Sequence, residues 1–145
     1  MRAQKAVDRF NAGFNCSQAV LAAFCEDYGL DSATATKLAV AFGGGLGRLG
    51  KACGCITGAL MVLGLRYGEN STSDSVIKLN NYDRAKALCE RFIEQNGALD
   101  CKDIIKFDLS NPEEYKQAQA AEVFKTKCSN IVADTVRLVE DAVRG

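Results

Sequence analysis

Apolar residues recur at three- and four-residue spacing along almost the whole chain, which is the period of an amphipathic helix. The pattern predicts helices near residues 3–11, 15–29, 32–42, 52–67, 75–95 and 128–143, and a further one that starts at Asn111. Residues 52–67 are apolar on all sides, which indicates a buried central helix. No strand-like alternation persists. The sequence therefore predicts one all-α domain over residues 1–145, a compact bundle of six to seven helices.

Residues typical of helix ends support these boundaries. Asn111 followed by Pro112 is a strong helix start, because the asparagine side chain accepts from free N–H groups and proline fits the first turn. Gly29 and Gly97 each follow an apolar-periodic segment, where glycine commonly ends a helix. Helix starts and stops therefore recur along the chain, as expected for a helical bundle.

Residues 43–50 form a glycine-rich segment, GGGLGRLG. Within it, residues 45–50 match G-x-G-x-x-G, and the run that ends at Lys51 nearly matches the phosphate loop G-x-x-x-x-G-K-[ST]. Both motifs require a preceding strand, which the pattern does not supply, and Ala52 lacks the hydroxyl group that would bind Mg²⁺. We expect a structural loop with tight turns, and keep binding of a phosphate ligand as a weaker alternative.

Cysteine is the residue type that carries candidate chemistry. Four of the seven cysteines fall where the chain is expected to enter a helix: Cys16, Cys53, Cys101 and Cys128. A helix N-terminus carries partial positive charge and free N–H groups, which stabilise a thiolate over a thiol. A lysine lies within two residues of three of these cysteines: Lys51, Lys102 and Lys127. We expect the four thiols to share one pocket.

The other three cysteines require separate interpretations. Cys25 and Cys89 lie on the apolar stripes of their helices, so we assign both to the core. Cys53 and Cys55 form a C-x-C pair whose side chains would point about 200° apart in a regular helix. They could meet only if the helix started at Cys55 or later. We favour one functional thiol and one packing cysteine, and leave open which of the two is reactive.

Composition excludes several classes of function. The chain contains no histidine, which rules out Cys–His and Ser–His–Asp catalysis. Eighteen basic and eighteen acidic residues cancel, so we expect no nucleic-acid or membrane partner. The first ten residues lack the apolar run of a signal peptide, and residues 52–65 are too short to span a membrane. We expect a cytoplasmic protein with reduced thiols.

Three segments together carry a resemblance to a known family. Residues 14–20 (FNCSQAV), the loop at 42–50 and residues 53–59 (CGCITGA) resemble the C_GCAxxG_C_C family of bacterial and archaeal proteins classed as redox-active. The resemblance spans nearly the whole chain and implies four family cysteines: Cys16, Cys53, Cys101 and Cys128. Its C-G-A-x-x-G motif corresponds to Cys53, Gly54 and Gly58, with Cys55 in place of the alanine.

Two main hypotheses follow. The first is a thiol-dependent oxidoreductase that uses no cofactor and works by thiol–disulfide exchange or electron transfer. In this hypothesis Cys53 attacks a disulfide, and Cys16, Cys101 or Cys128 resolves the intermediate. Lys51, Gly54 and Gly58 support that site, and the partner is a redox protein or a small thiol. The second is a zinc or iron–sulfur protein that uses Cys16, Cys53, Cys101 and Cys128 as ligands. No C-x-x-C pair or other local metal signature supports this alternative.

Overall fold

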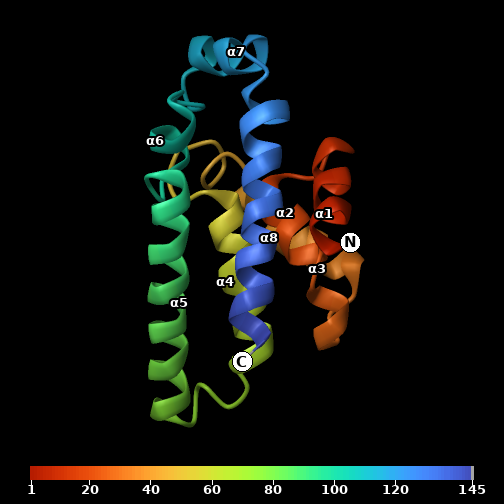
Figure 1. Ribbon diagram of the computed structural model, residues 1–145, viewed down its shortest axis with the longest axis vertical. Helices are drawn as coiled ribbons and strands as arrows, with labels where there is room; N and C mark the ends of the chain where they lie inside the picture. The colour runs from red at the N-terminus through yellow and green to blue at the C-terminus, as the bar shows by residue number, and fades with distance from the viewer. Residues whose placement is uncertain (145) are drawn as a thin grey trace.

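Helices make up most of the protein in the computed structural model, which describes residues 1–144 (Figure 1). The α-helices are α1 (Arg2–Asn11), α2 (Cys16–Ala22), α3 (Ser32–Ala39), α4 (Gly54–Tyr67), α5 (Ser75–Asn96), α6 (Cys101–Ile105), α7 (Pro112–Ala120) and α8 (Ser129–Arg144). These residues contain no strand, so the all-α prediction is confirmed. The predicted count of six to seven helices was wrong, because the turn after Asp100 completes a separate helix, α6.

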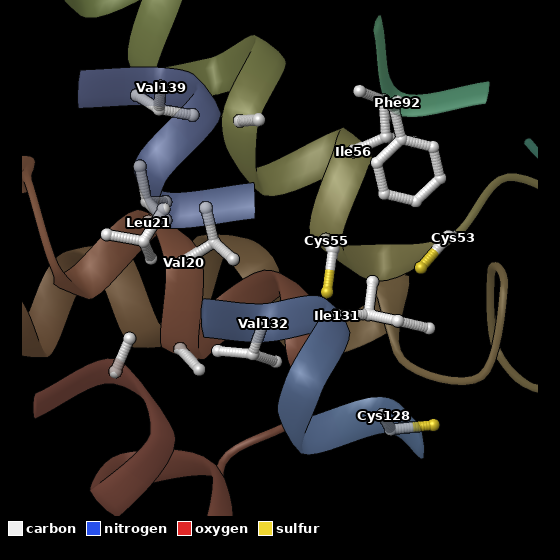
Figure 2. Close-up of a cluster of buried hydrophobic side chains, with 14 of the residues drawn as sticks. Val20, Leu21, Cys53, Cys55, Ile56, Phe92, Cys128, Ile131, Val132 and Val139 are labelled. Carbon is white, nitrogen blue, oxygen red and sulfur yellow. The ribbon is translucent and has the colours of Figure 1, made fainter. Parts of the chain in front are cut away.

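The long helices α4, α5 and α8 run side by side, while α1, α2 and α3 lie to their right in Figure 1, with α1 packed on α8 and α2 packed on α4. The short helix α7 crosses one end of the bundle. Helix α4 contacts α2, α5 and α8, as expected for a central helix that is apolar on all sides. Figure 2 shows Val20 of α2, Ile56 of α4, Phe92 of α5 and Val132 of α8 packed in this core.

Two predicted helices are shorter than their apolar patterns. The segment 15–29 forms α2 only to Ala22, because the N–H groups of Ala23 and Phe24 bond three residues back and tighten the turn. A 3-10 turn then runs from Cys25 to Tyr28 and ends at Gly29. The segment 32–42 likewise ends as α3 at Ala39 and continues as a 3-10 turn. Periodicity alone does not distinguish these tighter turns from an α-helix.

The most apolar helix, α4, has 14 residues. A helix that spans a bilayer needs about 20 predominantly apolar residues. Across residues 1–144, no helix combines the length and the hydropathy needed to cross a membrane.

Candidate functional site

A cavity of about 920 Å³ opens at the end of the bundle where several helices begin. Five of the seven cysteines line it: Cys16, Cys53, Cys55, Cys101 and Cys128. Cys16 is half-buried, whereas each of the other four is less than one-tenth exposed. Cys25 and Cys89 do not line the cavity; Cys25 is fully buried and Cys89 half-buried against the core.

Cys16 is the first residue of α2, and the residue before it fixes its position. The Asn15 side chain accepts a hydrogen bond from the Gln18 N–H at 2.9 Å, and the Gln18 side chain accepts one from the Asn15 N–H at 2.8 Å. This capping box starts the helix at Cys16. The Asn15 amide also donates to the Val40 carbonyl at 2.9 Å, which ties the start of α2 to the turn before the glycine loop.

Cys53 and Cys55 lie on either side of the start of α4. Cys53 is the N-cap residue, with extended backbone angles of φ −56° and ψ 136°, and the helix begins at Gly54. Because Cys53 is outside the helix, the separation of about 200° does not apply to this pair. The two side chains are close enough that, in addition to burial, Cys53 raises the pKa of the Cys55 thiol. The C-x-C pair therefore brings two thiols close together although α4 begins at Gly54, so the condition that the helix start at Cys55 or later was too strict.

Glycines let α2 approach α4 closely enough to bring their cysteines together. A Cβ atom at Gly54 would lie 2.9 Å from the Ser17 nitrogen, and one at Gly58 would lie 2.7 Å from the Ser17 carbonyl oxygen. Both distances are shorter than real Cβ contacts allow. The Thr57 hydroxyl donates to the Ser17 hydroxyl at 3.2 Å across the same contact. Gly54 and Gly58, the predicted supporting residues, thus lie where α2 meets α4.

Cys101 reaches the cavity through a short pairing of extended backbone. The Cys53 N–H donates to the Leu99 carbonyl at 2.8 Å, and the Cys101 N–H donates to the Lys51 carbonyl at 2.7 Å. An antiparallel bridge joins Ala52 to the residue before Cys101. Residues 50–53 and 99–102 therefore run beside each other, which places Cys101 next to Cys53. No strand pattern in the sequence indicated this pairing.

Cys128 does not lie at a helix N-terminus, so that part of the sequence interpretation was wrong. It ends a π-helical segment, Phe124–Cys128, which continues directly into α8. Cys128 directly precedes the first residue of α8, Ser129. In Figure 2, Ile131 lies between Cys128 and the pair Cys53 and Cys55. A π-helical segment is an irregularity that residue spacing does not reveal, and such segments are frequent at functional sites.

The lysines adjacent in sequence to the cysteines do not line the cavity. Lys51 and Lys102 are exposed, and the Lys127 ammonium group donates to the Ile104 carbonyl. The cationic side chains that do line the cavity belong to Arg48 and Lys125, two residues that the sequence analysis did not select.

Hydrogen bonds among the thiols separate the pKa of Cys16 from those of its neighbours. The Cys128 and Cys55 thiols both donate to Cys16 and lower its pKa well below the ordinary value. The same bond to Cys16, together with burial, raises the pKa of Cys128. Burial raises the pKa of Cys55 and, with the charges of Cys53 and Cys16, raises that of Cys101 to about 12. The arrangement favours the thiolate form at Cys16 over that at Cys55, Cys101 and Cys128.

The glycine loop forms a left-handed turn along one wall of the cavity. Five consecutive residues have φ between +57° and +73°: Gly44, Gly45, Leu46, Gly47 and Arg48. A 3-10 turn, not a strand, precedes it. The N–H groups of residues 46–51 all donate to carbonyls of residues 41–46. These groups are therefore not free to bind a phosphate, and the glycines serve the left-handed backbone.

The same cavity contains the four cysteines that the metal hypothesis names as ligands: Cys16, Cys53, Cys101 and Cys128. Within residues 1–144, no three cysteine or carboxylate side chains are arranged as a group that could hold a metal ion.

The fold and the site define an all-α protein whose thiols are gathered at one cavity. Residues 14–142 match the model of the family described as "Putative redox-active protein (C_GCAxxG_C_C)". Because this match covers most of the chain, the protein belongs to that family. No curated protein and no solved structure matches the chain.

Proposed function

We propose that this protein is a thiol-dependent oxidoreductase that exchanges a disulfide with its substrate, and that Cys16 is the attacking thiol. The observation that carries the proposal is that Cys16 is the most accessible of the five cavity cysteines and lies among thiols that lower its pKa, those of Cys128 and Cys55. The thiolate is the nucleophile in such exchange, and hydrogen bonds to the charged form favour it. Membership in a redox-active family supports the same chemistry.

Cys16 replaces Cys53, the leading candidate from sequence, for two reasons. Cys16 is half-buried, whereas Cys53 is 7% exposed, so a substrate reaches Cys16 more readily. Cys16 is also the cysteine whose pKa the site lowers. Cys128 is the resolving thiol in this proposal, because its hydrogen bond lowers the pKa of Cys16 more than the bond from Cys55 does.

The exchange takes two steps. The Cys16 thiolate attacks one sulfur of a substrate disulfide R–S–S–R, a bond forms between Cys16 and that sulfur, and one R–S⁻ leaves. Cys128 then loses its proton to solvent and attacks the Cys16 sulfur, which forms the Cys16–Cys128 disulfide and releases the second R–S⁻. The substrate is reduced by two electrons and the protein is oxidised by two. A dithiol of the cell then reduces the protein disulfide, which fits a reducing compartment such as the cytoplasm.

Peptide mapping after reaction with a small disulfide tests this assignment. The protein is purified without oxygen, treated with one equivalent of oxidised dithiothreitol or glutathione, and digested after rapid alkylation. We expect a disulfide between Cys16 and Cys128. Cys16→Ser should abolish it, whereas Cys128→Ser should trap a mixed disulfide on Cys16.

Two results would contradict the proposal. One is a disulfide that excludes Cys16, for example between Cys53 and Cys101. The other is stoichiometric zinc or iron in the anaerobically purified protein that survives chelation, with unfolding on its removal, which would support the metal hypothesis. Cys89→Ser is the matched control, because it removes a thiol that does not line the cavity.

A further inference from the structure

The wall of the thiol cavity is apolar and positively charged. Four aromatic side chains line it: Phe10, Phe14, Tyr115 and Phe124. The charged side chains among its lining residues are those of Arg48 and Lys125, and no carboxylate of residues 1–144 lines it. The chain as a whole has no net charge, so this local excess of positive charge is specific to the cavity.

Arg48 is held in place at the cavity from two directions. Its backbone lies in the left-handed turn, with φ +67°. Its guanidinium lies 4.1 Å from the centre of the Tyr115 ring and donates to the Tyr115 hydroxyl at 2.9 Å. Tyr115 belongs to α7 and packs against Phe124 at 6.0 Å. A left-handed backbone at a non-glycine residue costs free energy. The contacts of Arg48 with Tyr115 on α7 therefore hold a residue whose backbone is strained.

The size of the cavity and the burial of its thiols favour a small molecule over a protein disulfide. A volume of about 920 Å³ is within the usual range for small-molecule pockets. Cys53, Cys55, Cys101 and Cys128 are each less than one-tenth exposed. Cys16, the thiol that attacks the substrate, lies in the wall of this cavity and is itself half-buried, so a small disulfide reaches it more readily than a disulfide on a folded protein surface.

We propose that the substrate of this site is a small anionic disulfide with an apolar or aromatic body. The proposal rests on the exchange function above and adds the class of substrate. Attack by the Cys16 thiolate on such a compound brings negative charges together, and each step releases an anionic thiolate. Arg48 and Lys125 offset that charge, while the aromatic wall accepts the apolar body.

The test compares an anionic with a neutral aromatic disulfide. Dithiobis(nitrobenzoate) carries two carboxylates, and dithiodipyridine is uncharged at pH 7. The second-order rate constant of each reagent with the reduced protein is divided by its rate constant with free cysteine. We expect the normalised ratio to favour the anionic reagent by about tenfold at low ionic strength, and to fall as salt is added.

Two variants connect the preference to the cavity. Arg48→Asn removes the charge and keeps a residue that tolerates positive φ, and Lys125→Gln removes the second charge independently. Each should lower the normalised ratio by roughly threefold, because the rate with the anionic reagent falls more than the rate with the neutral reagent. Lys86→Gln is the matched control, because it removes an exposed charge on α5 that does not line the cavity.

The outcomes separate the two proposals. If the normalised ratio is one in the unmodified protein, or if Lys86→Gln lowers it as much as Arg48→Asn and Lys125→Gln do, the anionic substrate class is overturned. The exchange function would still stand in that case, provided that both reagents oxidise Cys16. If neither reagent forms a disulfide that includes Cys16, the exchange function itself fails.

Discussion

The seven cysteines divide into two groups that the fold places in different surroundings. Five lie at one cavity. Cys16 and Cys101 begin helices α2 and α6, Cys53 caps α4, Cys55 lies in the first turn of α4, and Cys128 ends a π-helical segment. Cys25 and Cys89 lie apart from it and pack against the apolar core. Burial is the main cause that raises the pKa of both isolated thiols, whereas contacts with other thiols shift the pKa values of Cys16 and Cys128.

The comparison shows that burial by itself raises the pKa of a thiol, whereas neighbouring thiols lower the pKa of one member of a cluster. Desolvation disfavours every thiolate, so a cluster of buried thiols without hydrogen bonds would remain protonated. In this cluster, the hydrogen bond between Cys16 and Cys128 lowers the pKa of Cys16 and raises the pKa of Cys128. The lowered pKa is therefore that of Cys16, the most accessible of the five cavity cysteines.

The largest expected effect is a difference in alkylation rate between the two groups. At pH 7 an ordinary thiol with a pKa of about 8.5 is only a few per cent thiolate, and a raised pKa lowers that fraction further. We expect iodoacetamide to modify Cys16 on the order of 100-fold faster than Cys25 or Cys89, as read by mass spectrometry of quenched samples. Faster modification of Cys25 or Cys89 would reverse the assignment of site and core.

The next effect concerns the contact between α2 and α4. Gly58→Ala places a methyl group 2.7 Å from the Ser17 carbonyl oxygen, so we expect the free energy of unfolding to fall by about 1–3 kcal/mol. Alkylation of Cys16 should also slow, because α2 moves away from Cys55. Gly64→Ala is the control in the same helix: nothing lies within 4 Å of the added methyl group, and stability should rise by up to about 1 kcal/mol. Urea unfolding measures both, and equal effects would contradict the close approach.

The hydrogen bond from Cys128 can be tested with two substitutions by small side chains. Cys128→Ser keeps a donor next to Cys16, whereas Cys128→Ala removes it. We expect the midpoint of the pH profile for alkylation of Cys16 to rise by about one unit in the alanine variant and to stay close to its original value in the serine variant. The same midpoint in both variants would show that the thiol of Cys128 does not set the pKa of Cys16.

The last effect is on stability and appears only at high pH. The pKa of Cys101 is raised to about 12 in the folded protein, so above pH ~8.5 the unfolded chain loses this proton first. The unfolded state then binds fewer protons, and the free energy of unfolding falls by up to about 1.4 kcal/mol per pH unit for this thiol. Cys101→Ser should make the decline between pH 9 and 11 shallower, as measured by urea unfolding under reducing conditions. An unchanged slope would contradict the raised pKa.

Much of the fold followed from local rules, because helix caps and stops act over a few residues. Asn111 starts α7, Gly97 ends α5, and the apolar run at 52–67 contains the central helix α4. The rule fails for Cys128, since the switch to π-helical hydrogen bonds before α8 leaves the apolar spacing nearly unchanged.

The site was harder to derive, because distant contacts build it. The same cysteines could be selected from sequence, but the thiol that the surroundings favour could not. That depends on the hydrogen bonds between Cys16, Cys55 and Cys128, which come from three separate segments. Arg48 reaches the cavity through a left-handed turn whose glycines resemble a phosphate loop in sequence. The missing strand and Ala52 already favoured a structural loop over a phosphate loop, but they gave no sign that the loop would bring Arg48 to the cavity.

The hydrogen bond between Cys16 and Cys128 also joins the first quarter of the chain to its last helical segment. During synthesis the N-terminal part emerges first, so Cys16 is exposed before its partner exists. Contacts between residues far apart in sequence form late, after the chain entropy of closing the intervening loops has been lost. Until then Cys16 keeps the pKa of an ordinary thiol. In the proposed function, the attacking thiol therefore reaches its lowered pKa only in the folded chain.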